Sequence, residues 1–182
     1  MYEFHRRVEH EIPRLRRYAR ALTRDSNRAD DLVQDTLVRG IAKAHLWQAG
    51  TDIRAWLFTI MHNQYVNDIR RTMCEQAAVD VEKVASTLVA TTDPTASRQL
   101  SELDRALGQL SKGQREVVLL VVLEGMFYDE AAKILRVPIG TVRSRLGRAR
   151  EALRLLMGID EQTKSADRVV RPRAPVEDGI AA

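Results

Sequence analysis

The sequence predicts an all-α fold made of two small helical domains joined by a flexible linker. Apolar residues recur at helical spacing through most of the 182 residues, and no segment alternates strictly with a period of two. This periodicity is lost over residues 73–98, where the charge turns acidic and the run TTDPT occurs. We therefore expect domains over 1–72 and 99–158, a linker over 73–98 and a mobile polar tail over 159–182.

Three helices are expected in the first domain. Pro13 lacks a backbone N–H and favours the first turn, which predicts a helix over 13–24, with a short turn of helix possible before it. Asp25, Ser26 and Asn27 form an N-cap cluster before a helix over 28–46. The stretch QAGT at 48–51 breaks the pattern, and the third helix is expected over 52–71. The apolar stripe of the second helix contains Leu32, Val33, Leu37, Ile41 and Ala44.

Four helices are expected in the second domain, over about 97–110, 114–124, 128–136 and 139–156. Ala131 and Ala132 are small enough to allow two helices to cross closely. A short turn follows, and Pro138 precedes the last helix. This order predicts a helix-turn-helix.

The last helix is expected to have one apolar and one cationic face. At about 100° per residue, Ile139, Val142, Leu146, Ala149 and Leu153 fall on one side. Arg143 or Arg148 on the other side could pair with guanine, and Ser144 could reach a base or a phosphate. The predicted DNA-binding residues are Thr141, Arg143, Ser144, Gly147 and Arg148. A plain surface helix is the alternative, but the turn, the cap and the arginine face coincide here.

An acidic cluster opens the helix at 28–46. Attraction to the positive end of the helix dipole explains Asp30 and Asp31, but it explains Gln34 and Asp35 less well. Magnesium chelation is disfavoured because the chain has no second acidic motif. A protein partner that contacts Asp31, Gln34 and Asp35 is the preferred interpretation.

A polar stripe on the helix at 52–71 predicts contact with single-stranded nucleic acid. Amides can read base edges, arginine can bind the backbone and an aromatic ring can stack on a base. Trp56 by itself is more often a core residue, so Asn63 is the stronger indication. The stripe consists of Trp56, Thr59, Asn63, Asn67 and Arg70.

Charge supports a polyanionic partner, and other residue types exclude several functions. Arginine makes up 24 of the 29 basic residues, and the two domains are net +4 and +3 around a linker of −2, with a tail of −1. Cys74 is the only cysteine, and the four histidines show no zinc-type spacing. The longest apolar run, Val117 to Leu123, is too short to span a membrane. We expect a cytoplasmic protein that is no enzyme and needs no metal or cofactor.

Several segments resemble bacterial RNA polymerase sigma factors of the extracytoplasmic-function (ECF) type. They are ADDLVQDT at 29–36, RAWL at 54–57 with Asn63, DIRR at 68–71, and GTVRSR at 140–145 with RAR at 148–150. The resemblance covers about residues 10–157, and the run at 126–132 is similar to the general-stress-response branch. It implies a sigma region 2-like domain over 1–72 and a region 4-like domain over 99–158.

The resemblance also implies the partners. The region of Asp31, Gln34 and Asp35 would dock on the β′ clamp helices of core RNA polymerase, and the polymerase contacts would also include the β flap. The loop at 47–52, with Asn63, would capture a base flipped from the melted −10 element. Arg143, Ser144, Gly147 and Arg148 would read the −35 element, and the linker would thread through polymerase. An anti-sigma factor would control the protein in a stress response.

Two other classes remain as alternatives. A helical adaptor or anti-sigma-like binder would contact acidic proteins with its arginines and show no promoter selectivity. A stand-alone repressor would bind duplex DNA as a dimer, although no heptad seam suggests one. The sigma factor hypothesis predicts selective transcription only when core polymerase is added.

Overall fold

The computed structural model describes residues 2–48, 50–76 and 94–158, and every regular element in these ranges is a helix. The elements are α1 (Tyr2–Thr23), α2 (Ser26–Ala42), the short turn η1 (Ala44–Leu46), α3 (Ile53–Gln76), α4 (Pro94–Gln109), α5 (Lys112–Val118), the π-helical turn η2 (Leu119–Leu123), α6 (Tyr128–Leu135) and α7 (Ile139–Leu156). The middle of the expected linker, 77–93, and the expected tail, 159–182, lie outside the described residues. The expected all-α fold is confirmed.

Helix α1 begins eleven residues earlier than expected, and Pro13 lies inside it. Phe4, Val8 and Leu15 are buried on one face of the helix, so the residues before Pro13 contribute to the core. Burying a large apolar side chain contributes about 1.5–3 kcal/mol, which offsets the roughly 3 kcal/mol cost of an interior proline. The expected start at Pro13 was wrong because local preference is weaker than this burial.

Helices α2 and α3 differ from expectation mainly at their ends. Asp25 is the N-cap of α2, and its carboxylate accepts from the Arg28 N–H at 2.9 Å. The helix ends at Ala42 and η1 follows, whereas one helix to residue 46 was expected. Ile41 is 48% exposed and therefore lies outside the core stripe predicted for it. Asp52 caps α3 by accepting from the Arg54 N–H at 2.8 Å.

The second half of the chain forms the expected helix-turn-helix. Ala131 is fully buried, as close packing between α6 and its neighbours requires. Arg136 ends α6 in the left-handed region at φ 53°, and Pro138 precedes α7. The helix expected over 114–124 is instead α5 followed by η2, in which the Glu124 N–H donates to the Leu119 carbonyl at 3.0 Å.

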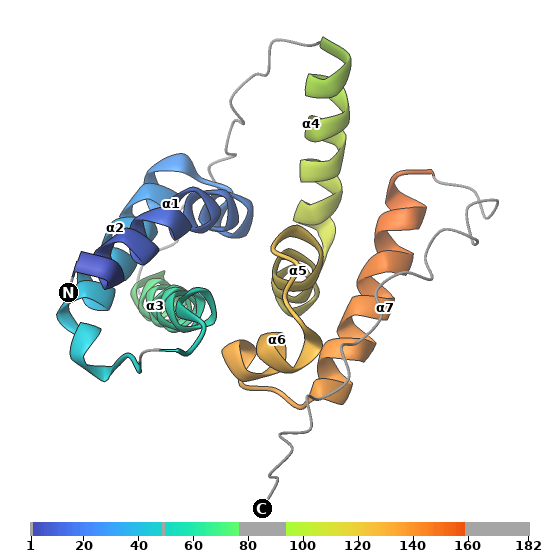
Figure 1. The fold of residues 1–182 in the computed structure, drawn as a ribbon. Coiled ribbons are helices and arrows are strands. Elements are labelled where there is room, and N and C mark those ends of the chain that lie inside the picture. The colour runs from blue at the N-terminus through green and yellow to red at the C-terminus, as the bar shows by residue number, and fades with distance from the viewer. Residues whose placement is uncertain (1, 49, 77–93, 159–182) are drawn as a thin grey trace, which may run out of the picture.

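The helices form two blocks that pack against each other. Figure 1 shows α1–α3 as one block, hereafter the first block, and α4–α7 as the second block, with α7 on the side away from the first. One continuous apolar core runs through both, from Phe4 to Ala149. The buried run from Val117 to Val121 includes η2, which packs against α1, while α6 packs against α3.

Candidate DNA and polymerase interfaces

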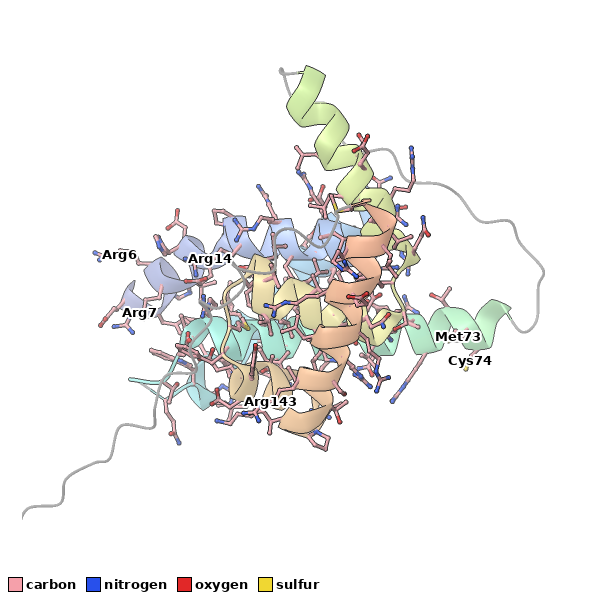
Figure 2. All side chains as sticks on the ribbon, turned by 90° about the vertical axis from the view of Figure 1, so that its right-hand side faces the viewer. Arg6, Arg7, Arg14, Met73, Cys74 and Arg143 are labelled. Carbon is pink, nitrogen blue, oxygen red and sulfur yellow. The ribbon has the colours of Figure 1, made fainter. Side chains whose placement is uncertain are left out.

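The outer face of α7 is exposed and cationic. Val142, Leu146 and Ala149 are buried beneath it, which confirms the predicted inner face, except that Ile139 is exposed and Leu153 is half-buried. Figure 2 shows Arg143 in the N-terminal half of this helix. Neither Arg143 nor Arg148 forms an ion pair with another described residue. Both guanidinium groups are therefore available to an external anion.

The small residues of this face leave the backbone of α7 uncovered. A Cβ atom built on Gly147 would meet no atom within 4 Å, so packing does not require glycine there. Ser144 donates to the Thr141 carbonyl at 3.1 Å and is exposed. All five residues predicted to bind duplex DNA are thus exposed or half-buried on one helix.

The predicted partner-binding residues of α2 also share one exposed face. Asp31, Gln34 and Asp35 are all exposed, and the Gln64 side chain of α3 donates to Asp35 Oδ2 at 3.2 Å. Further along the same helix, Val38 is 61% exposed. The acidic cluster therefore continues into an apolar surface.

The predicted single-strand stripe lies on the less buried side of α3. Asn67 and Arg70 are exposed, whereas Thr59 and Asn63 are half-buried. Trp56 is also half-buried, and its ring lies 6.1 Å from that of Phe4, edge to face. Trp56 therefore shares the stripe but packs against α1, in line with the core role that is common for tryptophan.

The loop between η1 and α3 lies next to this stripe along the chain. Gly50 adopts φ +95°, a conformation that favours glycine. Thr51 donates two hydrogen bonds to the Gln48 carbonyl. Its backbone N–H lies 3.1 Å from that oxygen and its hydroxyl 2.7 Å. Gln48, Gly50 and Thr51 are exposed, while Trp47 is half-buried.

Ion pairs connect the two blocks. Arg17 of α1 contacts Glu124 at 2.9 Å, and the Arg54 side chain donates to the Glu124 carbonyl at 3.2 Å. Arg24, at the end of α1, contacts Asp104 of α4 at 2.9 Å. Such contacts fix which surfaces of the two blocks face each other.

Several polar groups are buried where the blocks meet. Burial raises the pKa of Glu124, although the hydrogen bond from Arg17 opposes this, and it also raises the pKa of Glu116. Burial lowers the pKa of His62 to about 4, and the nearby charges of Lys112 and Arg136 act in the same direction. Glu116 Oε1, Glu124 Oε2, His62 Nδ1 and the Tyr18 hydroxyl have no hydrogen-bond partner among the described residues.

An apolar groove of about 890 Å³ runs between the blocks, and the sequence analysis did not foresee it. Its rim includes Arg16, Arg17 and Arg20 of α1. The 3.6-residue spacing of Leu100, Leu103 and Leu107 in α4 could have indicated it. We call this surface the interblock groove; its apolar lining is Ile12, Pro13, Ala21, Leu100, Leu103, Leu107, Val118, Leu119, Val122, Leu123 and Leu153.

Metal binding and membrane insertion would each require a particular arrangement of the described residues. Within the described ranges, His, Cys, Asp and Glu side chains nowhere gather in threes as a metal site would need. Among the described helices, none combines the length and apolar character needed to cross a bilayer.

Both halves of the chain match sigma factor domains. Residues 8–62 match the family described as the Sigma2 domain of PhyR, and residues 100–153 match sigma-70 region 4. These ranges contain the acidic face of α2, most of α7, and Trp56 and Thr59 of the polar stripe, whereas the rest of the stripe follows the first match.

Relatives along most of the chain are ECF sigma factors. The ECF RNA polymerase sigma factor EcfG of Rhodopseudomonas palustris is 39% identical over 149 residues, which is 82% of each chain. The RNA polymerase sigma factor CnrH of Cupriavidus metallidurans is 33% identical, over 73% of this chain and 75% of its own. The sigma factor RpoE of Bartonella quintana, solved in complex with the anti-sigma factor NepR, superposes with a TM-score of 0.81 at 34% identity, covering 88% of this chain and 99% of that one. The exposed faces described above therefore lie in a chain that belongs to the ECF RNA polymerase sigma factors.

Proposed function

We propose that the chain binds core RNA polymerase in the bacterial cytoplasm and directs it to promoters by reading the −35 and −10 elements. The exposed cationic face of α7, above a buried apolar face, is the observation on which this proposal depends most. The protein would act through binding free energy and not through covalent chemistry, since capture of an unstacked base offsets a few kcal/mol of unpairing.

In the −35 element, α7 would lie in the major groove. Arg143 and Arg148 would pair with guanine edges or phosphates, and Thr141 and Ser144 would contact bases or the backbone. Gly147 would let the helix backbone approach the duplex, because no side chain separates them there.

In the −10 element, the loop at 47–52, in which Gln48, Gly50 and Thr51 are exposed, and the α3 stripe would bind the melted strand. Asn63 and Asn67 supply amides and Arg70 supplies a cation for the backbone. Thr59 and Trp56 would complete this surface, with Trp56 holding the helix against α1 at the same time.

Docking on polymerase would use the exposed face of α2. Asp31, Gln34 and Asp35 present acceptors and charge, and the neighbouring exposed Val38 and Ile41 present apolar area. A mixed surface of this kind fits the β′ clamp helices, while the second block would contact the β flap.

The decisive experiment is run-off transcription with purified core polymerase on a library of genomic fragments. The wild-type chain should give transcripts from a defined set of promoters only when core is present. Arg148→Ala should weaken −35 binding by roughly 1–3 kcal/mol and relax base preference at one position.

Arg105→Ala is the matched control, because Arg105 is an exposed arginine of α4 in the same block. It should leave base preference unchanged. Equal weakening of all promoter sequences by Arg148→Ala would contradict a base contact, and an absence of promoter selectivity in the wild type would favour the adaptor hypothesis.

An anti-sigma factor of the general-stress-response kind is the regulator that we propose. RpoE was solved with the anti-sigma factor NepR, and CnrH was solved with the cytosolic domain of CnrY. The interblock groove has an apolar lining with Arg16, Arg17 and Arg20 at its rim, which suits an amphipathic helix with acidic residues. Because residues of both blocks line this groove, a helix bound there would hold the blocks together.

A further inference from the structure

The side chain of Trp47 is the point at which the loop at 47–52 rests on the first block. Gln48, Gly50, Thr51 and Asp52 are exposed, whereas Trp47 is half-buried and packs against the apolar core. At the other end of the loop, Asp52 caps α3 by accepting from two backbone N–H groups, at 2.8 and 3.4 Å. The position of the loop therefore depends on what contacts Trp47.

The first two turns of α1 form the surface on which Trp47 packs. The ring of Phe4, only 6% exposed, lies 5.6 Å from the Trp47 ring with 52° between their planes. The Arg7 guanidinium lies 5.8 Å from the centre of the Trp47 ring, within the range of a cation–π contact. Glu3 pairs with Arg7 at 2.6 Å, which orients the guanidinium. Figure 2 shows Arg6 and Arg7 near the beginning of α1.

The same phenylalanine also contacts the polar stripe of α3. Its ring lies 6.1 Å from that of Trp56, at 72°, an edge-to-face arrangement. Phe4 thus contacts both tryptophans, one in the loop and one in the stripe. Without this ring, no aromatic contact among the described residues would connect the loop with α3.

We infer that Phe4, assisted by Arg7, is a positioning residue for −10 recognition: it sets the loop at 47–52 against the α3 stripe without itself touching DNA. The inference rests on the proposed function, which assigns this loop and stripe to the melted strand. A preformed pocket favours capture of a base, because ordering the loop during binding would subtract from the free energy of binding. The N-terminal turns of α1 thereby contribute to promoter selectivity through the position of the loop.

The test is −10 selectivity, measured as the ratio of run-off transcripts from a mapped promoter and from the same promoter with one −10 base replaced. Phe4→Leu keeps an apolar side chain and removes the ring. We expect it to lower this ratio roughly two- to tenfold, the range of measured aromatic pair contributions. Phe4→Tyr keeps the ring and should restore the ratio.

Val8→Ala is the matched control, since Val8 is buried on the same face of α1 one turn later and makes no aromatic contact with the loop. It should lower the melting temperature and leave the ratio unchanged. An unchanged ratio in Phe4→Leu, or an equal loss in Val8→Ala, would overturn the inference. A wild-type chain without promoter selectivity would instead refute the proposed function, so the two failures are distinguishable.

Discussion

His62 is an ionisable side chain placed where its charged form is disfavoured. It is buried between α3 and the second block, and Lys112 of α5 and Arg136 at the end of α6 are the charges that act on it. Its pKa is lowered to about 4, whereas an unfolded chain would titrate near 6.5. The unfolded state therefore binds more protons than the folded state between these two values.

This difference predicts a pH dependence of stability. The contribution of neutral His62 is complete above pH 6.5 and is lost as the pH falls toward 4, by up to about 3 kcal/mol in the free energy of unfolding. Glu116 and Glu124, whose pKa values are raised, act in the opposite sense. Urea unfolding of wild type and His62→Gln at several pH values measures the contribution of the histidine. The free energy of unfolding should fall more steeply between pH 6.5 and 4 in the wild type than in the variant. Parallel curves for the two proteins would contradict this.

Among the helices, α1 has a proline in its interior. Pro13 cannot donate a backbone hydrogen bond, and its exposed ring contributes little to the core. Pro138 occupies a different position, the N-cap of α7, where no helical hydrogen bond is lost. The two prolines should therefore respond oppositely to the same substitution.

Pro13→Ala should raise the free energy of unfolding by about 1–3 kcal/mol, because it restores a helical hydrogen bond. Pro138→Ala should leave the free energy of unfolding unchanged or lower it by up to about 1 kcal/mol, because removing the proline ring raises the conformational entropy of the unfolded chain. Thermal unfolding of both variants checks the prediction. A lower melting temperature for Pro13→Ala would contradict the prediction, because the exposed proline ring would then have to stabilise the fold by packing.

At the scale of the whole molecule, contact between the blocks conflicts with promoter binding. Elements centred near −35 and −10 are about 25 base pairs apart, roughly 85 Å along B-form DNA. A compact body of this size has a radius of gyration of only about 15 Å. On the proposed function, the blocks must separate on polymerase. Separation that exposes Glu116 Oε1 would let water supply the hydrogen bond that this oxygen lacks among the described residues, where Lys112 Nζ lies 3.9 Å away.

Gly108 tests this contact. A Cβ atom there would overlap the Arg24 guanidinium, which would have to shift and so disturb its ion pair with Asp104. Gly108→Ala should therefore weaken the contact between the blocks by about 0.5–1 kcal/mol, since the ion pair is partly exposed. Small-angle X-ray scattering should report a larger radius of gyration. Gly140→Ala, where a Cβ atom meets nothing within 4 Å, is the control. Equal radii for the two variants would show that Arg24 does not hold the blocks together.

Helical periodicity was sufficient to predict the all-α fold class, most of the helices and the residues that share an exposed face. Periodicity decides these features because a helix presents every third or fourth residue on one side, as with Arg143 and Arg148 opposite Val142 and Ala149. The cap at Asp25 could also be predicted, because an N-cap depends on residues that are close together along the chain.

Several other features depend on contacts between residues distant in sequence, and periodicity could not predict them. Pro13 inside α1, the packing of the two blocks, the interblock groove and the placement of Phe4 on Trp47 all result from burial between segments tens of residues apart. Local spacing cannot encode such contacts, because the free energy that fixes them comes from apolar area that exists only when the helices are assembled.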